Sequence, residues 1–327
     1  MMKKAPFFLL LTLFVYGCKV PSDVNDAYEN DTDATDLFEQ LMADEKNGIK
    51  RPVYQESEEL LHDLVHTKLE VSFDWDSLQL NGIADITVSP HFKEQDSLVL
   101  DAKAIEVHKV HYMDRERVGT QLDFKADGEF LTIDLGMPWG RQFEYTVRIW
   151  YTANPEKVGQ SGSAAISGAK GLYFINADGS QKDKPTQIWT QGETEASSCW
   201  FPTIDAPNQK TTQEIYITVD EKYKSLSNGL LVYSTPNNDG TRTDYWKMDQ
   251  PHAPYLFMMA IGDFAVVEDQ WVKSDGSKMA VHYYVEKEFE PHAKAIFGKT
   301  PKMLSYFSDL LGVEYPWDKY HQVVVRD

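Results

Sequence analysis

The chain has 327 residues, of which 42% are hydrophobic and 13% aromatic, and it carries a formal net charge of −19. The hydrophobic content is enough for packed cores, which excludes a chain that is disordered throughout. The negative charge repels phosphate backbones and therefore argues against nucleic-acid binding. The length favours two domains.

The beginning of the chain has the pattern of an export signal. Lys3 and Lys4 precede an apolar run, residues 5–16, that is too short to span a bilayer. A glycine and Cys18 follow, which resembles a bacterial lipobox in which Cys18 is acylated and becomes the mature N-terminus. An ordinary signal peptide cut nearby is the alternative. We expect a lipoprotein signal peptide over residues 1–18, and a protein exported and lipid-anchored to the bacterial cell envelope, at the periplasmic or outer-membrane surface.

Residues 19–59 are predicted to form an acidic, flexible tether, because self-repulsion and low hydrophobicity favour an extended chain. Its acidic residues, with no basic residue between them, are Asp23, Asp26, Glu29, Asp31, Asp33 and Asp36. A spacer that lifts a domain off a membrane is the first interpretation, and an acidic interaction arm is the alternative. The chain has two cysteines. If Cys18 carries lipid, Cys199 has no partner and the core alone must hold the fold.

From His66 onward, apolar and polar residues alternate as in strands with one buried face. The first such run, residues 69–75, leads to the turn signal Asn81-Gly82. Further strands are expected at 84–88, 97–100, 105–112, 131–135, 143–151, 172–175, 215–219, 230–233, 245–248 and 256–261. Many short strands separated by turn residues indicate a mainly β, antiparallel sandwich or saddle.

The pattern changes after Trp271. A helix is predicted to begin at Pro291, to be kinked or split at Pro301 and to end near Gly312. Strands are predicted on either side of it, at 279–285 and 320–325. A second, mixed α/β domain therefore begins near residue 270. This part of the chain has only a few elements, so we expect their apolar faces to lack enough partners to form a core.

Two histidine pairs invite a metal-site interpretation. His62-Asp63-Leu64-Val65-His66 imitates a zinc motif, but Asp63 stands where the general-base glutamate belongs, and His66 lies at the start of a strand. His108 and His111 are three apart in a predicted strand and so point to opposite faces. Neither pair is expected to bind a metal.

The segment 190–208 is the most informative one. It begins with the polar run Thr190-Gln191-Gly192-Glu193-Thr194-Glu195 and continues into an aromatic and proline-rich stretch. Cys199 lies between them without an adjacent base and is predicted to be a small buried residue rather than a nucleophile. Taken alone, the polar run is a solvated turn packed on aromatic residues.

This segment resembles the Gln-x-Glu and aromatic-Pro-x-x-Asp segments of the aminopeptidase N family of zinc metallopeptidases. Three other stretches carry the same resemblance, namely 66–71 with the Asn81-Gly82 hairpin, 254–262 and 315–325. It implies that residues 60–268 are the family's saddle-shaped β-domain and that residues 269–327 are the start of its thermolysin-like metallopeptidase domain, truncated. It also implies that Gln191 and Glu193 bind substrate. A carboxylate such as Glu193 suits the free α-ammonium of a peptide.

The resemblance further implies zinc in the full-length family, held by elements that would follow residue 327. These are a Gly-Ala-Met-Glu-Asn loop, a His-Glu-x-x-His helix, a glutamate ligand and a tyrosine. We therefore expect no catalytic residue and no bound zinc in these 327 residues. The first hypothesis is a fragment or interrupted reading frame of an aminopeptidase acting on peptides with a free N-terminus. The alternative is a non-catalytic, lipid-anchored peptide-binding or structural lipoprotein with the same β-domain.

Overall fold

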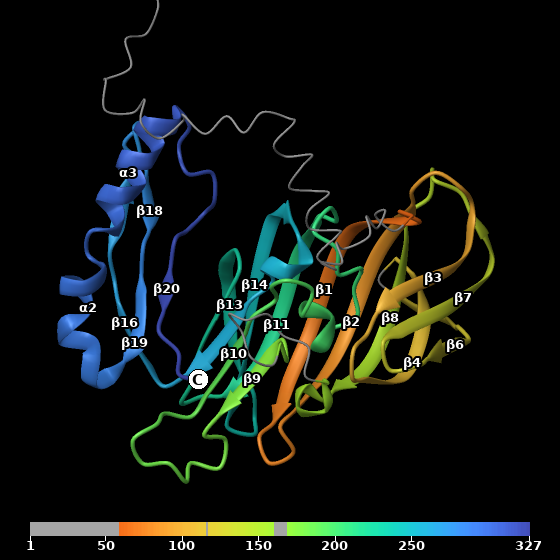
Figure 1. The fold of residues 1–327 in the computed structure, drawn as a ribbon, viewed down its shortest axis with the longest axis horizontal. Coiled ribbons are helices and arrows are strands. Elements are labelled where there is room, and N and C mark those ends of the chain that lie inside the picture. Colours follow the sequence, from red (N-terminus) through yellow and green to blue (C-terminus); the bar gives the residue numbers. More distant parts are fainter. Residues whose placement is uncertain (1–58, 116, 160–168) are drawn as a thin grey trace, which may run out of the picture. The chain divides into compact units, whose positions relative to one another are not determined.

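The computed structural model describes residues 59–115, 117–159 and 169–327, and residues 59–327 form one unit (Figure 1). The predicted signal peptide, Cys18 and residues 19–58 of the predicted tether lie outside the described part. In that part, no helix is long and apolar enough to cross a bilayer.

The largest element is an eight-stranded sheet in the order β13-β14-β11-β1-β2-β8-β4-β5. Its strands are β1 (His62–Asp74), β2 (Gln79–Pro90), β4 (Ile105–Asp114), β5 (Arg117–Gln121), β8 (Tyr145–Ala153), β11 (Thr211–Asp220), β13 (Leu230–Pro236) and β14 (Thr241–His252). All neighbours pair antiparallel except β1 and β11, which are parallel. Leu69 lies opposite both Ala84 and Ile215, and all three side chains are fully buried. The alternation seen in the sequence thus builds one apolar face.

Two smaller sheets share the main core with this face. One has the order β12-β15-β10-β9 and contains β9 (Leu172–Ile175), β10 (Gln187–Thr190), β12 (Lys224–Ser227) and β15 (Met259–Gly262). The other has the order β3-β7-β6 and contains β3 (Gln95–Asp101), β6 (Phe124–Ala126) and β7 (Phe130–Trp139). Short 3-10 turns connect strands in this region, namely η2 (Pro155–Lys157), η3 (Ser197–Cys199) and η4 (Pro254–Leu256). The prediction of a mainly β fold is confirmed.

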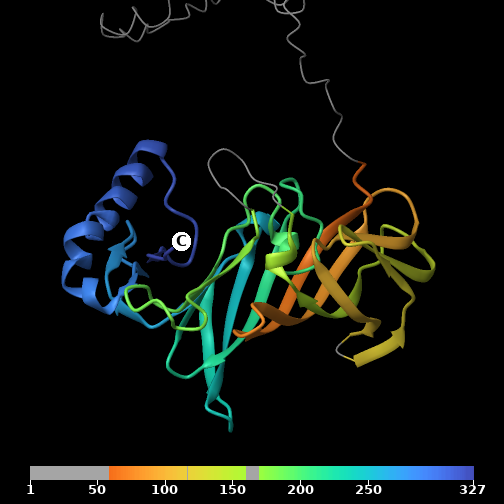
Figure 2. The same ribbon diagram turned by 60° about the horizontal axis from the view of Figure 1, so that its bottom comes forward.

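The C-terminal region has its own small core. Its elements are β16 (Phe264–Val267), β17 (Gln270–Val272), β18 (Lys278–Ala280), β19 (Tyr283–Glu286), η5 (Lys287–Phe289), α2 (Glu290–Phe297), α3 (Thr300–Leu311) and β20 (Gln322–Val323). Figures 1 and 2 show both helices on one side of the sheet formed by β16, β19 and β20. Trp271, Tyr283 and Leu304 are buried in this small core.

The predicted helix is indeed divided at its proline. α2 ends at Phe297, Pro301 lies in the first turn of α3, and Gly312 ends α3 with a φ of 67°. Such a left-handed residue is a common helix stop, because glycine has no Cβ to strain. Five large hydrophobic residues of α3 remain exposed, Met303, Tyr306, Phe307, Leu310 and Leu311.

Several predicted strand boundaries were wrong, and three of them show why. The strand expected at 279–285 is two strands, β18 and β19, which pair with different partners. The strand expected at 320–325 is limited to Gln322–Val323. The strand expected from 143 begins at Tyr145, and Phe143 is exposed. In each case the neighbouring backbone, rather than the local alternation, decides where pairing stops.

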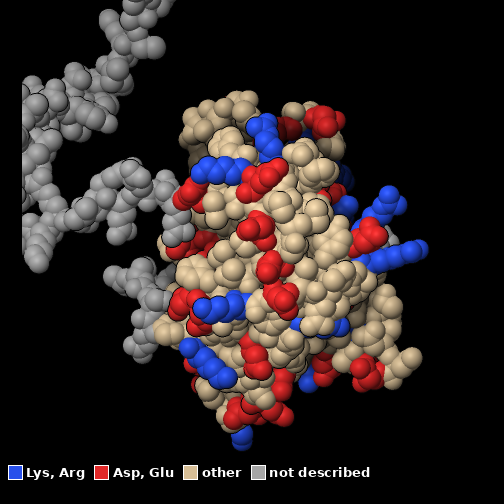
Figure 3. All heavy atoms as spheres, turned by 90° about the vertical axis from the view of Figure 1, so that its right-hand side faces the viewer, with Lys and Arg blue, Asp and Glu red and all other residues tan. Residues whose placement is uncertain are grey.

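The surface in Figure 3 carries acidic and basic side chains interspersed with uncharged ones. On the face shown there, basic side chains form no continuous tract. This face therefore lacks the extended positive surface that a nucleic-acid backbone would need.

Candidate functional site

The polar run of the sequence forms a loop that leaves the end of β10. This strand lies inside the four-stranded sheet, between β15 and β9. The Thr190 hydroxyl accepts a hydrogen bond from the Met259 amide at 2.9 Å, and the Gln191 amide donates to the Gly171 carbonyl at 2.9 Å. Gln191 is therefore held by its backbone at the root of the loop, with its side chain half-buried.

Gly192 allows the loop to turn tightly against its neighbours. A Cβ at this position would lie 2.3 Å from the Tyr255 carbonyl oxygen and 2.6 Å from the Ser197 hydroxyl. The Gly192 carbonyl accepts the Ala196 amide at 2.9 Å, and the Ser197 hydroxyl donates to the Pro254 carbonyl at 2.8 Å. Glycine at position 192 is thus needed for the shape of the loop, while Gln191 and Glu193 on either side supply its polar groups.

Aromatic residues form the base of the loop. Trp200 and Phe201 are fully buried, and their rings meet edge to face at 4.4 Å between centroids. Phe201 stacks on Phe257 at 5.1 Å. The aromatic-proline stretch therefore supports the loop, as expected from the sequence, and such packing limits its movement.

The tip of the loop is formed by Glu193, Thr194 and Glu195, which are exposed. The Glu195 carbonyl accepts a hydrogen bond from the Lys103 ammonium at 2.8 Å. Among the ion pairs between described residues, none uses the Glu193 carboxylate. The structure thus places Gln191 and Glu193 on one short, supported loop and leaves a carboxylate available on it.

Asp205 is a buried carboxyl group beneath this loop. It accepts a hydrogen bond from the Ser198 amide at 2.8 Å, and its own amide donates to the Asp101 carboxylate at 2.8 Å. Burial raises the pKa of Asp205 to about 6, although the Ser198 hydrogen bonds oppose this rise. Its place in the aromatic-Pro-x-x-Asp stretch was visible in the sequence, but its burial was not.

Cys199 lies in η3 and is buried. Burial raises the pKa of its thiol to about 12, so it stays protonated at neutral pH. Because the thiolate is the nucleophilic form, Cys199 is unsuited to nucleophilic catalysis.

The zinc-like histidine pair has structural partners instead. His62 lies 2.8 Å from the Tyr145 hydroxyl, and burial lowers its pKa to about 4. His66 lies 2.7 Å from the Thr212 hydroxyl. Both belong to β1, which begins at His62 and not at His66 as predicted, and the register shifts between Leu64 and His66. These histidines are on a strand, not on one face of a helix.

Groups of three or more His, Cys, Asp or Glu residues that could hold a metal are not found within 59–115, 117–159 and 169–327. The ligands that a catalytic zinc requires are therefore not provided by the described residues. No step of a zinc reaction can be derived from them.

The last residues of the chain run beside β10. The Arg326 amide donates to the Gln187 side chain at 3.0 Å, and the Trp189 indole donates to the Arg326 carbonyl at 2.9 Å. The Arg326 guanidinium pairs with Glu286 of β19. The strand that leads to Gln191 therefore also positions residues near 326, far away in the sequence.

A sequence profile of the Peptidase M1 N-terminal domain matches residues 62–256. The chain belongs to this family. Aminopeptidase N of Haemophilus influenzae is 27% identical over 205 residues, which are 62% of this chain and 21% of that protein. The chain thus spans about a fifth of that M1 relative. The resemblance inferred from the sequence motifs is confirmed over the N-terminal portion.

Other relatives show how widely the domain occurs. Subunit 2 of the transcription initiation factor TFIID from Gallus gallus is 23% identical over 160 residues, which are 48% of this chain and 13% of that protein. A crystal structure of an M1 zinc metallopeptidase from Deinococcus radiodurans, bound to a Tyr-Ser-Ala substrate, has a TM-score of 0.65 and 16% identity. The match covers 81% of this chain and 57% of that one. At this identity the likeness shows the fold alone.

Proposed function

We propose that the chain is the N-terminal part of a zinc aminopeptidase and that its Gln191–Glu193 loop recognises the free N-terminus of a peptide. The observation that carries this proposal is the exposed, unpaired Glu193 carboxylate on a loop held by buried aromatic residues. A carboxylate forms strong, charge-assisted hydrogen bonds with an ammonium group. Fixing that ammonium determines which peptide bond is presented for hydrolysis.

Gln191 has a different part in this proposal. Its side chain is half-buried at the root of the loop, where its amide can accept or donate hydrogen bonds to the first residue of a peptide. The chemistry of bond cleavage would come from a zinc ion held by residues outside those described here. The described residues bind and orient a substrate and perform no chemical step.

Matched glutamates on the same loop test the proposal. Glu193 and Glu195 are both exposed, so Glu193→Gln and Glu195→Gln remove the same charge two residues apart. Both variants would be made in a polypeptide that also contains a zinc-binding catalytic region, with alanyl-p-nitroanilide as substrate. We expect Glu193→Gln to lower kcat/KM at least tenfold and Glu195→Gln to leave it unchanged. Equal kinetics for the two variants would remove Glu193 from the site.

A second candidate function is a binding module without peptidase activity. The relative named as a TFIID subunit favours it, because this domain then occurs in a protein that is not named as a peptidase. The DNA after the Asp327 codon distinguishes the two candidates. Codons for Gly-Ala-Met-Glu-Asn shortly afterwards would select the aminopeptidase, whereas a stop codon and a cooperatively folded product would select the binding module.

We also propose that the protein is exported and anchored to the cell envelope by a lipid on Cys18. The support is the sequence pattern of Lys3, Lys4, the apolar run and the glycine before Cys18. Radiolabelled palmitate should enter the wild-type protein and not the Cys18→Ser variant. Equal labelling of both would exclude this anchor.

A further inference from the structure

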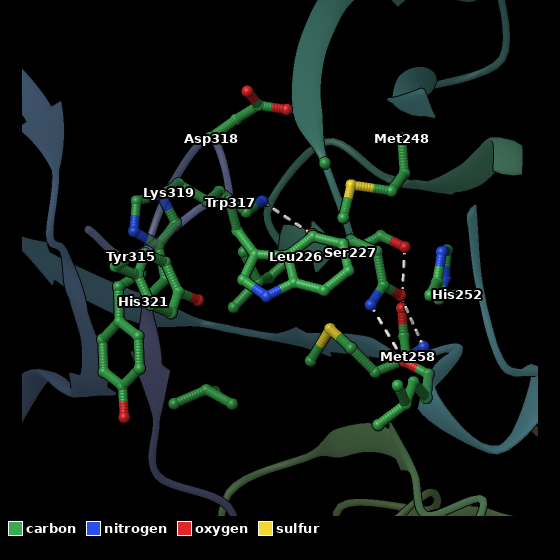
Figure 4. Close-up of a pocket in the computed structure, with 15 residues that line it drawn as sticks. Leu226, Ser227, Met248, His252, Met258, Tyr315, Trp317, Asp318, Lys319 and His321 are labelled. Carbon is green, nitrogen blue, oxygen red and sulfur yellow. Dashed lines mark hydrogen bonds between the residues drawn. The ribbon is translucent and has the colours of Figure 1, made fainter. Parts of the chain in front are cut away.

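A cavity of about 380 Å³ lies between the β12–β13 turn, the end of β14 with η4, and the segment that precedes β20. Its volume is at the lower end of the range of about 300–1,000 Å³ for small-molecule sites. Figure 4 shows the thioethers of Met248 and Met258, the Trp317 indole and Lys319 around this space. The lining is mostly apolar, with a single lysine among it.

The ammonium group of Lys319 is the unusual feature of this cavity. It donates a hydrogen bond to the Ser227 carbonyl at 2.6 Å and lies 4.0 Å from the centre of the Trp246 ring. An ammonium has three donors. Within the described part of the chain, no second hydrogen bond and no ion pair of this group is found. A cation in apolar surroundings is therefore left without a carboxylate.

The other titratable groups of the cavity do not compensate this charge. Burial lowers the pKa of His252, which lies 3.1 Å from the Gln213 side chain. Burial also lowers the pKa of His321 to about 3, and its ring stacks on His282, whose pKa is lowered too. These histidines are uncharged at neutral pH.

The remaining groups are an acid and two phenols. Asp318, the carboxylate adjacent in sequence, is exposed. Burial raises the pKa of Tyr315 to about 12, and Tyr320 is the other phenol that lines the cavity. No carboxylate is buried in the cavity to balance Lys319.

We propose that this cavity binds an apolar monocarboxylate, with its carboxylate on the Lys319 ammonium and its body against Met248, Met258 and Trp317. The Lys319 ammonium is partly buried and has one hydrogen bond but no ion pair, so a bound carboxylate would supply the opposite charge and further acceptors. A free amino acid fits less well, because its α-ammonium would lie beside Lys319. None of the residues that line the cavity belongs to the Gln191–Glu193 loop, and the proposal does not depend on the function proposed for that loop.

The binding should depend on pH. Desolvation lowers the pKa of Lys319 to about 7, although the Asp318 charge opposes this. A carboxylate binds the protonated lysine, so binding is coupled to proton uptake above this pKa. The affinity should be nearly constant below pH 6 and fall about tenfold per pH unit above pH 8.

Three ligands with one aromatic body test the proposal by calorimetric titration of the complete chain at pH 6. 3-Phenylpropanoate should bind, whereas 3-phenylpropan-1-ol and phenylalanine should bind at least tenfold more weakly. Lys319→Met should weaken 3-phenylpropanoate binding at least tenfold, and the exposed control Lys125→Met should not change it. Lys319→Arg should keep the binding and remove its decrease between pH 7 and 9, because arginine stays charged.

A second type of variant separates binding from folding. Leu256 lines the cavity and is 44% exposed, so Leu256→Trp narrows the cavity and keeps Lys319. It should abolish 3-phenylpropanoate binding while near-ultraviolet circular dichroism stays unchanged. The proposal is wrong if the acid and the alcohol bind equally, if folded Lys319→Met or Leu256→Trp binds like wild type, or if the affinity is the same at pH 6 and 9. If phenylalanine binds and this binding is lost in Glu193→Gln, the amino acid binds at the Gln191–Glu193 loop and not in the cavity.

Discussion

Replacing Asp205 by asparagine should change how the stability of the protein depends on pH. Asp205 is 6% exposed, and burial raises its pKa from 3.8 to about 6. The native state therefore holds this proton more tightly than the unfolded state. The contribution of Asp205 to stability is most favourable below pH 4, decreases as the pH rises towards 6, and stays at its low value above about pH 7.

The size of this effect follows from the shift. At about 1.4 kcal/mol per pKa unit, a shift from 3.8 to about 6 corresponds to roughly 3 kcal/mol of lost stability at pH 8. Asparagine keeps an oxygen that can accept the Ser198 amide and carries no charge.

Urea unfolding at pH 4.5, 6 and 8 measures the effect. Relative to wild type, Asp205→Asn should gain roughly 2–3 kcal/mol in free energy of unfolding between pH 4.5 and 8. Asp127→Asn serves as the control, and its free energy of unfolding relative to wild type should change with pH in the opposite direction. The reason is that backbone hydrogen bonds lower the pKa of this exposed carboxylate. Parallel pH profiles for wild type and Asp205→Asn, or a larger loss for the variant at pH 8, would refute the reasoning.

Two further predictions concern the same loop. Gly192→Ala should lower the free energy of unfolding by about 1–3 kcal/mol or prevent folding, because the new Cβ would meet the Tyr255 carbonyl at 2.3 Å. The control Gly128→Ala, where no atom lies within 4 Å of a Cβ, should lose only the smaller amount due to its positive φ, and equal losses in urea unfolding would contradict the packing argument. Cys199 should react with a chromogenic disulfide reagent only after denaturation, because its thiol is buried and protonated. Rapid reaction in the native protein at pH 7.5 would show that the thiol is accessible.

The alternation of residues was sufficient to predict the β-structure but not the arrangement of the strands. Leu69 and Val71 identify a strand with one buried face, yet nothing local indicates that β1 pairs in parallel with β11, whose paired residues lie 146 positions later (Leu69 with Ile215, for example). The end of β20 could not be predicted either. Beyond it, the Val324 amide still donates to Tyr284, but the Arg326 amide donates to the Gln187 side chain and so departs from a strand ladder.

In the candidate site, too, some residues could be predicted from the sequence and others could not. Gln191 and Glu193 were found through the resemblance to a family, and the aromatic support of their loop was visible in the stretch that follows them. The burial of Asp205 and the unpaired charge of Lys319 depend on contacts with distant segments, at Asp101 and at Ser227. Such groups look like ordinary charged residues in a sequence, because tertiary structure alone removes them from water.

The central claim is our proposal that the part of the chain the structure describes orients a peptide but holds no catalytic zinc, and its most direct test is a combined measurement on the purified chain. Its zinc content after dialysis and its hydrolysis of alanyl-p-nitroanilide would be determined on the same sample. The account predicts less than one tenth of an equivalent of zinc and no turnover above the rate in buffer. One equivalent of tightly bound zinc together with measurable turnover would contradict it.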